Sequence, residues 1–219
     1  MILAVAATQM ELSPFLAVMG DSGGRWKSLV SGLGPVETAV RLGRFLFENS
    51  TQIQGVIQFG VGGAYIQPDP VNQVPILAAC LANREVLGDL GIALQDDIDY
   101  FPQELGGRVE FSLDNTLLKR SRKVFDNNNV TCFSGTFITV NSVSGTARRG
   151  EILRRQWDGL CENMEGASAA RLCNELNIPL VELRVISNLV EDRNVENWQL
   201  QEGCARAAEL AALLVKELI

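Results

Sequence analysis

Histidine is absent from all 219 residues of this sequence. This absence excludes Ser-His-Asp and Cys-His catalysis, histidine-ligated zinc and a histidine general base. If the protein is an enzyme, its proton transfers must use carboxylates, lysines, tyrosines, cysteines or bound water.

Cysteine is scarce, and no CxxC pair occurs. The sequence therefore indicates neither a disulfide framework nor a zinc site. We expect most of the cysteines to be small core residues. They are Cys80, Cys132, Cys161, Cys173 and Cys204.

Long apolar runs and an excess of positive charge are missing as well. The run Ile2–Ala7 is too short for a signal-peptide core with its flanks, and no stretch is long enough to span a bilayer, so we expect a cytoplasmic protein. The net charge of -7 argues against sequence-independent binding of nucleic acid or of anionic membranes. Because no linker or internal repeat divides the chain, a single domain over residues 1–219 is predicted.

Short apolar runs alternate with helical patterns along most of the chain. This alternation predicts an α/β sandwich with a mixed, mostly parallel sheet. In the predicted helix Pro35–Asn49, apolar residues fall at helical spacing from Val36 to Phe47. Loops are expected at Gln67–Gln73 and Gln95–Phe101. The predicted strands are Ile2–Ala7, Trp26–Ser31, Gly55–Phe59, Val74–Leu81, Val130–Phe133, Phe137–Val140, Gly159–Asn163 and Leu180–Ser187, and the other helices are Asn115–Phe125, Ala147–Trp157, Glu165–Glu175 and Leu200–Leu218.

A glycine-rich segment, FGVGGA at residues 59–64, ends one predicted strand and is expected to form a turn. Glycines there let the backbone approach a ligand closely and offer it N–H groups. The segment is neither the G-x-G-x-x-G dinucleotide fingerprint nor a Walker loop. A tight turn without a ligand is an equally good interpretation.

Polar side chains follow three other predicted strands. Glu165 begins a helix and could accept both hydroxyls of a ribose cis-diol, although complementing the helix dipole is the commoner role there. Asn188 follows a buried strand and could read the lactam edge of a 6-oxopurine, or could be a turn residue. Glu11 follows the first strand and could lie at the same rim, or in the first turn of a helix.

Together these segments are more specific than any one of them. The pairing of ENMEGASAA (162–170) with VELRVISN (181–188), after the glycine-rich segment, resembles the purine nucleoside phosphorylase and nucleosidase superfamily. The resemblance is closest to its branch of methylthioadenosine/adenosylhomocysteine-type nucleosidases and covers nearly the whole chain. It implies a three-layer nucleoside phosphorylase-like sandwich and cleavage of an N-glycosidic bond without metal or organic cofactor.

The resemblance also implies roles for particular residues. Glu11 matches the glutamate that activates the attacking water, and Asn188 matches the residue that contacts the leaving base. Gly62 and Gly63 match the loop under the ribose. Met164 packs on the sugar in this scheme, and Glu165 binds its 2′- and 3′-hydroxyls, while Val143 and Ser144 align near the segment that lines the base.

The sequence departs from the adenine-cleaving relatives at one position. They carry an aspartate that protonates N7 where this chain has Asn188, and an asparagine cannot be a general acid. It can hydrogen-bond the O6/N7 edge of a hypoxanthine-type base. With VEDRN (190–194) and Trp198, the pattern resembles the futalosine hydrolase family, which implies release of hypoxanthine from futalosine in menaquinone biosynthesis.

Several alternatives stay open. A phosphorylase would need cations around phosphate, and Arg41 and Arg44 are candidates, although solvent-facing helix charges are the better interpretation. An adenine-specific nucleosidase is disfavoured by Asn188 alone. A non-catalytic nucleoside-binding protein would be expected to lose Glu11 or Glu165, and both are present. By resemblance, a homodimer or larger homo-oligomer is expected, with a partner chain helping to close the 5′ pocket.

Overall fold

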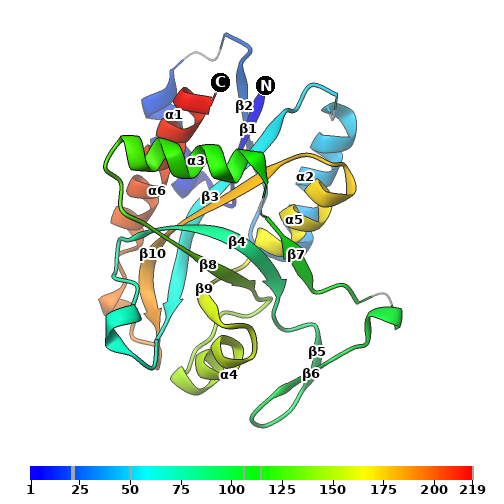
Figure 1. Cartoon of the computed structure of the whole chain (residues 1–219), viewed down its shortest axis with the longest axis vertical. Helices are drawn as coiled ribbons and strands as arrows, with labels where there is room; N and C mark the ends of the chain where they lie inside the picture. The colour runs from blue at the N-terminus through cyan, green and yellow to red at the C-terminus, as the bar shows by residue number, and fades with distance from the viewer. Residues whose placement is uncertain (21–22, 50, 106, 114, 219) are drawn as a thin grey trace.

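A mixed eight-stranded sheet runs through the molecule (Figure 1). The computed structural model describes residues 1–20, 23–49, 51–105, 107–113 and 115–218. The strands lie in the order β10-β4-β8-β9-β3-β1-β2, β7 pairs with β4, and β3 also pairs with β10, which closes part of the sheet on itself. Their bounds are β1 Ile2–Ala6, β2 Trp26–Val30, β3 Gly55–Tyr65, β4 Ala79–Leu87, β7 Glu110–Ser112, β8 Cys132–Thr139, β9 Gly159–Asn163 and β10 Leu180–Val190.

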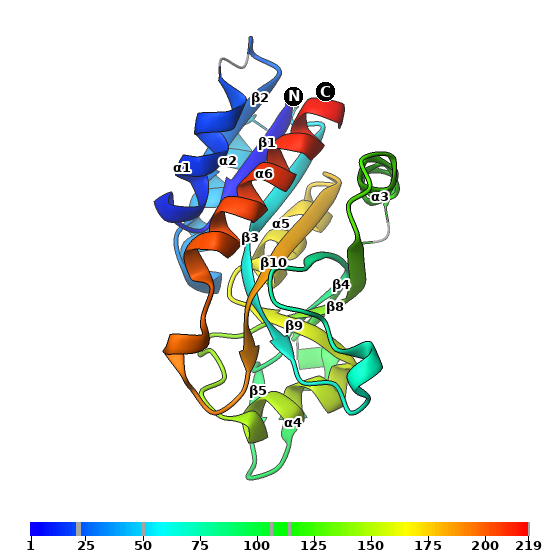
Figure 2. The same cartoon turned by 90° about the vertical axis from the view of Figure 1, so that its left-hand side faces the viewer.

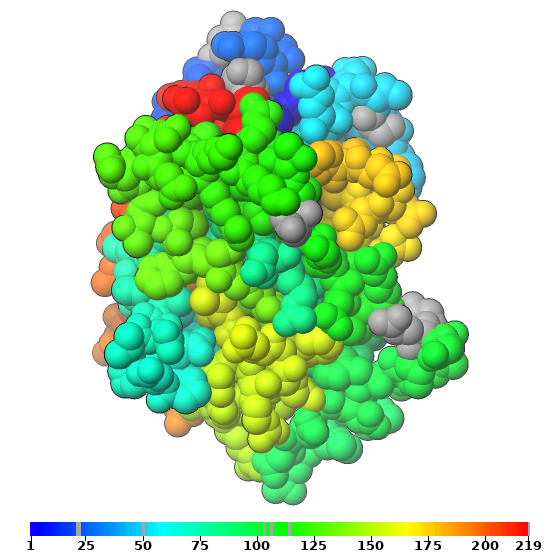
Figure 3. Space-filling model, in the orientation of Figure 1, coloured from blue at the N-terminus to red at the C-terminus, as the bar shows by residue number. Residues whose placement is uncertain are grey.

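Helices cover both faces of this sheet, as Figure 2 shows from the side, and the predicted three-layer α/β architecture is confirmed. One layer holds α1, α3 and α6, the other α2 and α5, and α4 packs beside β9. Figure 3 shows α3 lying across one face of the molecule. Their bounds are α1 Gln9–Met19, α2 Gly34–Asn49, α3 Thr116–Asn127, α4 Ala147–Trp157, α5 Gly166–Glu175 and α6 Leu200–Leu218.

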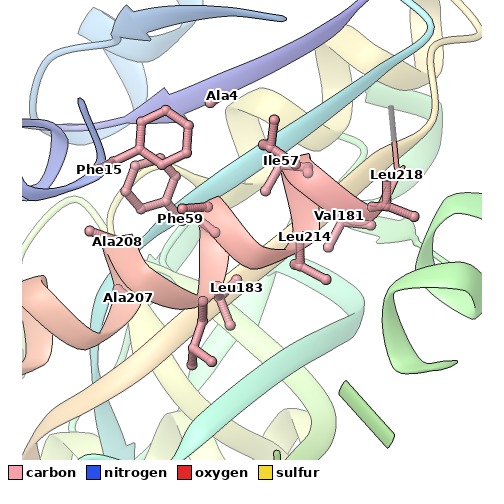
Figure 4. Close-up of a cluster of buried hydrophobic side chains, with 14 of the residues drawn as sticks. Ala4, Phe15, Ile57, Phe59, Val181, Leu183, Ala207, Ala208, Leu214 and Leu218 are labelled. Atoms are coloured by element: carbon pink, nitrogen blue, oxygen red, sulfur yellow. The ribbon is translucent and has the colours of Figure 1, made fainter. Parts of the chain in front are cut away.

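The closing helix α6 packs on the middle of the sheet through small side chains (Figure 4). Ala207 and Ala208 are fully buried and let the helix lie close to the strands. Phe15 from α1 stacks on Phe59 of β3, with ring centroids 5.2 Å apart. Leu214 completes this cluster. Burial of such apolar surface stabilises the folded state by about 25 cal/mol per Å².

Most predicted elements are confirmed, but the glycine-rich turn is wrong. Residues 60–64 continue β3, which runs unbroken to Tyr65, because β10 pairs with the whole segment and β9 pairs with Gly63 and Ala64. The strand predicted at Val74–Leu81 begins only at Ala79 and extends to Leu87. The two strands predicted near residues 130–140 form the single strand β8.

Some short elements escaped prediction. The expected loop Gln95–Phe101 contains β6 (Ile98–Tyr100), which pairs with β5 (Gly91–Ala93) in a hairpin at the lower end of Figure 1. The loop Gln67–Gln73 is confirmed apart from one 3-10 turn, η1, at Pro70–Asn72. Two further 3-10 turns, η2 and η3, occupy Gln103–Leu105 and Val195–Asn197.

Helix α2 presents two apolar faces. Thr38, Leu42 and Leu46 are buried against the sheet side, whereas Val36 and Val40, at the helical spacing noted in the sequence, point to solvent. In the part of the chain that the structure describes, no helix is long and apolar enough to cross a membrane. The cysteines are free thiols, four of them buried and Cys132 partly so, which confirms their expected place in the core.

Candidate active site

A cavity of about 390 Å³ opens where the ends of several elements meet. Its walls come from the β1–α1 junction, the middle of β3, the β9–α5 junction, the end of β10 and the start of α6. This volume is in the range of small-molecule sites. All the site residues predicted from the sequence line it: Glu11, Gly62, Gly63, Val143, Ser144, Met164, Glu165 and Asn188.

Glu11 lies in the first turn of α1, and its carboxylate is held at the wall of the cavity by hydrogen bonds. Thr8 caps the helix, and its N–H and Oγ1 donate to Glu11 Oε2 at 3.0 and 2.9 Å. This is a capping box, which holds the glutamate side chain back over the start of the helix. The other oxygen, Oε1, accepts the Val61 N–H of β3 at 3.2 Å.

The environment of Glu11 suits a general base. Burial raises the pKa of its carboxyl group and the nearby charge of Glu165 adds to the rise, while the Arg184 charge opposes both. A glutamate pKa moved upward comes nearer the range in which a carboxylate takes protons effectively. The close packing requires Gly60, because a Cβ there would collide with Glu11 Oε1.

Glu165 occupies the N-cap position of α5, but its carboxylate does not cap that helix. Oε1 accepts the N–H of Gly34 at 3.0 Å, and Oε2 accepts Nη1 of Arg184 at 3.2 Å. The side chain is buried and lines the cavity. A helix-dipole role therefore does not account for its orientation, and the carboxylate is available to a ligand.

Arg184 is a site residue that the sequence reasoning missed. It is buried in the middle of β10, where its guanidinium binds Glu182 at 3.0 Å, Glu165 at 3.2 Å and the Val61 carbonyl at 3.2 Å. The signal was present: Glu182 and Arg184 alternate inside an apolar strand, and charged residues are almost never buried without a partner.

A second buried cluster supports the β9–α5 junction from below. Asn163 donates its amide to Glu85 and accepts the N–H groups of Glu165 and Gly166 at 2.9 and 2.8 Å. The carboxyl groups of Glu85 and Glu182 lie together, since a Cβ on Gly166 would collide with both. Burial and the neighbouring Glu182 charge raise the pKa of Glu85 well above its ordinary value.

At the Gly63 end of the cavity the polar group is an amide, that of Asn188. Asn188, expected after the strand, lies inside β10 just past a bulge and faces Gly63 of β3. Its Oδ1 accepts the Ser187 hydroxyl at 2.8 Å, and its Nδ2 donates one hydrogen to the Leu189 carbonyl at 3.0 Å. Ser187 thereby fixes which way the amide faces, and a second Nδ2 hydrogen is left for a ligand.

Glu162 is the second cavity residue that the sequence reasoning missed. It lies on β9 opposite Gly63, and its Oε1 accepts the N–H of Ser144 at 2.9 Å. Met164 and Val143 add apolar wall, and so does Trp198, over which Arg193 stacks at 5.0 Å. Within the described ranges, no group of three or more acidic, cysteine or histidine side chains is arranged to hold a metal ion.

Comparison with known proteins agrees with this geometry. The profile of the phosphorylase superfamily matches residues 6–219. The sequence is 30% identical over 207 residues to the futalosine hydrolase of Thermus thermophilus (93% of this chain, 87% of that one) and 28% identical over 199 residues to the futalosine hydrolase of Streptomyces coelicolor (88% and 80%). The solved 5′-methylthioadenosine/S-adenosylhomocysteine nucleosidase of Helicobacter pylori has the same fold, with a TM-score of 0.83 over 99% of this chain and 97% of that one, at 19% identity.

Proposed function

The chain belongs to the phosphorylase superfamily, and from that premise we propose that it is a nucleosidase that hydrolyses the N-glycosidic bond of a 6-oxopurine nucleoside. The futalosine hydrolases among its relatives indicate futalosine as the substrate. The products are then hypoxanthine and dehypoxanthine futalosine, in the cytoplasmic route to menaquinone.

The observation that carries this proposal is the placement of two carboxylates and an amide around one cavity. Glu165 can bind the ribose diol, and Glu11 lies beside it with a raised pKa, so a water between Glu11 and the sugar would be well placed to attack C1′. We assign Asn188, which is in register with Gly63, to the base. Binding of the diol away from the reacting bond holds the sugar in position for attack.

The reaction is then a dissociative hydrolysis. The C1′–N9 bond breaks, its electron pair moves onto the base, and the sugar becomes oxocarbenium-like. Water bonds to C1′ and gives its proton to Glu11. Asn188 donates a hydrogen bond to the negative charge that develops on the base. The leaving base takes a proton from solvent water, and the hydroxide so formed takes the proton from Glu11, which restores its carboxylate.

Water is a better nucleophile for this cavity than phosphate. Among the described residues that line it, Arg184 alone is basic, and its guanidinium is already bound by Glu165 and Glu182. Arg41 and Arg44 lie on the exposed face of α2, where they pair with glutamates on their own helix. A dianion would therefore meet carboxylates without an unpaired cation to offset them.

The arrangement also argues against a passive binding protein. A protein that only binds nucleosides has no need of a buried carboxylate with a raised pKa beside the diol-binding group, and keeping Glu11 buried opposes folding. An adenine-specific nucleosidase is the nearer alternative, and Asn188 separates it from the proposed activity because an amide cannot protonate N7.

We also propose that the active form is a homodimer. Leu33, Val36, Val40 and Phe47 form an exposed apolar stripe on and beside α2, and Leu33 lines the cavity as well. Apolar stripes of this kind mark protein contacts. A second copy seated there would cover the mouth of the cavity near the 5′ group of the substrate.

The proposal is tested by incubating the protein with futalosine, inosine and methylthioadenosine in buffers with and without phosphate. We expect hypoxanthine and the free sugar from futalosine, at a rate that does not depend on phosphate. Chromatography identifies the products. A sugar 1-phosphate product would contradict hydrolysis, and preferential release of adenine from methylthioadenosine would contradict the 6-oxopurine assignment.

A further inference from the structure

Thr8 stands between β1 and α1 and contacts Glu11 through two donors. Its backbone N–H lies 3.0 Å and its hydroxyl oxygen 2.9 Å from Oε2 of Glu11. The same hydroxyl oxygen accepts the Glu11 N–H at 3.4 Å, which caps α1. Thr8 also lines the cavity. One short side chain therefore serves the start of the helix and the carboxylate of Glu11 at once.

The two oxygens of the Glu11 carboxylate are used unequally. Each carboxylate oxygen has about two lone-pair sites, and both donors of Thr8 converge on Oε2. Among the residues that the structure describes, Oε1 accepts only the Val61 N–H, at 3.2 Å. It approaches the bare backbone of Gly60, where a Cβ would collide with it and would lie 3.1 Å from Nη1 of Arg184. Oε1 therefore keeps a lone pair that can take a proton.

We infer that Thr8 is a positioning residue, whose two hydrogen bonds occupy Oε2 and hold Glu11 so that Oε1 accepts the proton of the attacking water. As the water oxygen bonds to C1′, one O–H bond of the water breaks and its proton moves to Oε1, while the Thr8 hydrogen bonds stay on Oε2. This inference rests on the proposed hydrolysis and extends it, because it names the oxygen that acts as the base and the residue that holds it.

Substitutions at Thr8 can separate the helix cap from the hold on Glu11. Capping needs an acceptor on the side chain, which serine and aspartate supply as well as threonine does. Holding the carboxylate needs a donor, which an ionised aspartate lacks. Thr8→Asp therefore keeps the cap and removes the hydroxyl donor, whereas Thr8→Val removes both at nearly constant shape. Thr8→Ser keeps both.

The proton affinity of Glu11 supplies a measurement that loss of a helix cap alone does not change. Burial raises the pKa of Glu11, and the Thr8 hydroxyl opposes this rise by bonding to the charged form. The charged and titratable side chains that face the carboxyl group are Arg184 of β10, Glu165 at the N-cap of α5 and Cys204 of α6. All three are kept in the Thr8 variants. Loss of the hydroxyl donor should therefore raise the pKa of Glu11, so that its carboxylate forms only at higher pH.

The test measures kcat/KM for release of hypoxanthine from futalosine along the acid limb of the pH profile, which reports groups of the free enzyme. In Thr8→Asp and Thr8→Val this limb should move upward by about 1 pH unit or more, as loss of a hydrogen bond to a charged group implies. The plateau of kcat should fall by about 10-fold, because the carboxylate is no longer held in place. Thr8→Ser should follow the wild type in both, and thermal unfolding checks that each variant is folded.

Thr146→Val is the matched control, because Thr146 caps a different helix, α4, by accepting the Arg149 N–H. Its acid limb should coincide with that of the wild type even if its stability falls. An acid limb that stays at the wild-type position in Thr8→Asp would overturn the inference and leave Thr8 as a helix cap, while hydrolysis of futalosine stands. If Thr8→Val does not fold, Thr8→Asp decides alone, since its cap is kept. A wild type that releases no hypoxanthine from futalosine would overturn the proposed function and this inference with it.

Discussion

Arg184 holds a full positive charge at the floor of the cavity, in the interior of the protein. The charges of Glu182, Glu165 and Glu11 offset its loss of hydration, in that order of strength. Removing one partner of such a buried group leaves an uncompensated charge, which costs about 3–5 kcal/mol. The three carboxylates and the arginine are therefore one electrostatic unit, and substitutions in it should keep the shape of the side chain.

Glu165→Gln is predicted to reduce catalysis while the protein stays folded. The amide keeps the shape of the side chain but loses the charge that binds a diol. The transition-state stabilisation calculated from kcat/KM should therefore fall by about 2–4 kcal/mol. Steady-state kinetics on futalosine measure the loss, and circular dichroism checks the fold. A variant with nearly full activity would mean that Glu165 only begins a helix.

Asn188→Asp is predicted to lower activity on the 6-oxopurine nucleoside. A carboxyl group can protonate N7 of adenine but lacks the N–H₂ donor for O6, so the variant should also gain on the 6-amino analogue with the same 5′ group. Sites matched to one polar edge discriminate by up to several kcal/mol. The ratio of kcat/KM for the two substrates, compared between wild type and variant, is the measurement, and an unchanged ratio would remove Asn188 from base selection.

Glu85 should make stability depend on pH. Its pKa in the folded protein lies above the value of 4.5 in the unfolded chain, so the folded state keeps a proton that the unfolded state loses. The stabilisation that this proton contributes is complete below the pKa of Glu85 in the unfolded chain. It is lost as the pH rises through the pKa of Glu85 in the folded protein. Glu85→Gln cannot ionise, and its amide can still donate to Glu182.

The stability of Glu85→Gln relative to wild type should accordingly increase with pH. Urea unfolding of both proteins at about pH 5 and about pH 8 gives the two differences in free energy. An equal difference at both pH values would mean that Glu85 does not hold its proton in the folded state.

At the scale of elements, the glycines of β3 let one strand serve three parts of the site. Gly60 admits Glu11 and Arg184, Gly62 lies beside Arg184, and Gly63 separates Asn188 from Glu162. Pairing with β10 along the segment, and with β9 at Gly63 and Ala64, holds this backbone extended, although glycine would favour a turn. The position of the backbone matters because small displacements of catalytic groups reduce rates strongly.

Gly60→Ala is predicted to abolish most activity, because its methyl group would displace the carboxylate of Glu11. Gly43→Ala is the control: its Cβ meets Leu172 at 3.5 Å, an ordinary contact, within helix α2. There alanine should leave kcat unchanged and stabilise the protein by about 0.5–1 kcal/mol. Kinetics and thermal unfolding of both variants test this pair, and an active Gly60→Ala enzyme would contradict the role given to Glu11.

At the scale of the whole molecule, the two apolar faces of α2 have different uses. One packs inside this chain, and the other presents Val36 and Val40, 71% and 63% exposed, to solvent. The first face stabilises the fold through burial. The second adds nothing to the fold of a lone chain, which is why we assign it to a second copy.

Val36→Asp with Val40→Asp is therefore predicted to give a folded monomer with a raised KM for futalosine. Two buried carboxylates would oppose association, whereas on a monomer they remain in water. Analytical ultracentrifugation measures the assembly, and Glu209→Gln is the control because its exposed side chain lies on α6, in the other helical layer. A wild-type protein that is monomeric at micromolar concentration would contradict the dimer.

The sequence by itself determined the α/β architecture, most helices and strands, and eight of the residues that line the cavity. These follow from local patterns: apolar periodicity, capping residues at helix starts, and motifs in which neighbouring residues act together. The lack of histidine likewise leaves carboxylates among the few groups that can transfer protons, whatever the fold. Glu11, Glu165 and Asn188 received roles only because their segments together resemble one superfamily.

Only the tertiary structure decided which distant residues meet. The glycine-rich segment became a strand because β9 and β10, about 100 residues further along the chain, pair with it, and local propensity cannot register such pairing. The same pairing brought Glu162 opposite Asn188 and placed Arg184 between the carboxylates of three elements. A charged residue in an apolar strand indicates that an oppositely charged partner is present, but only long-range packing determines which residue that partner is.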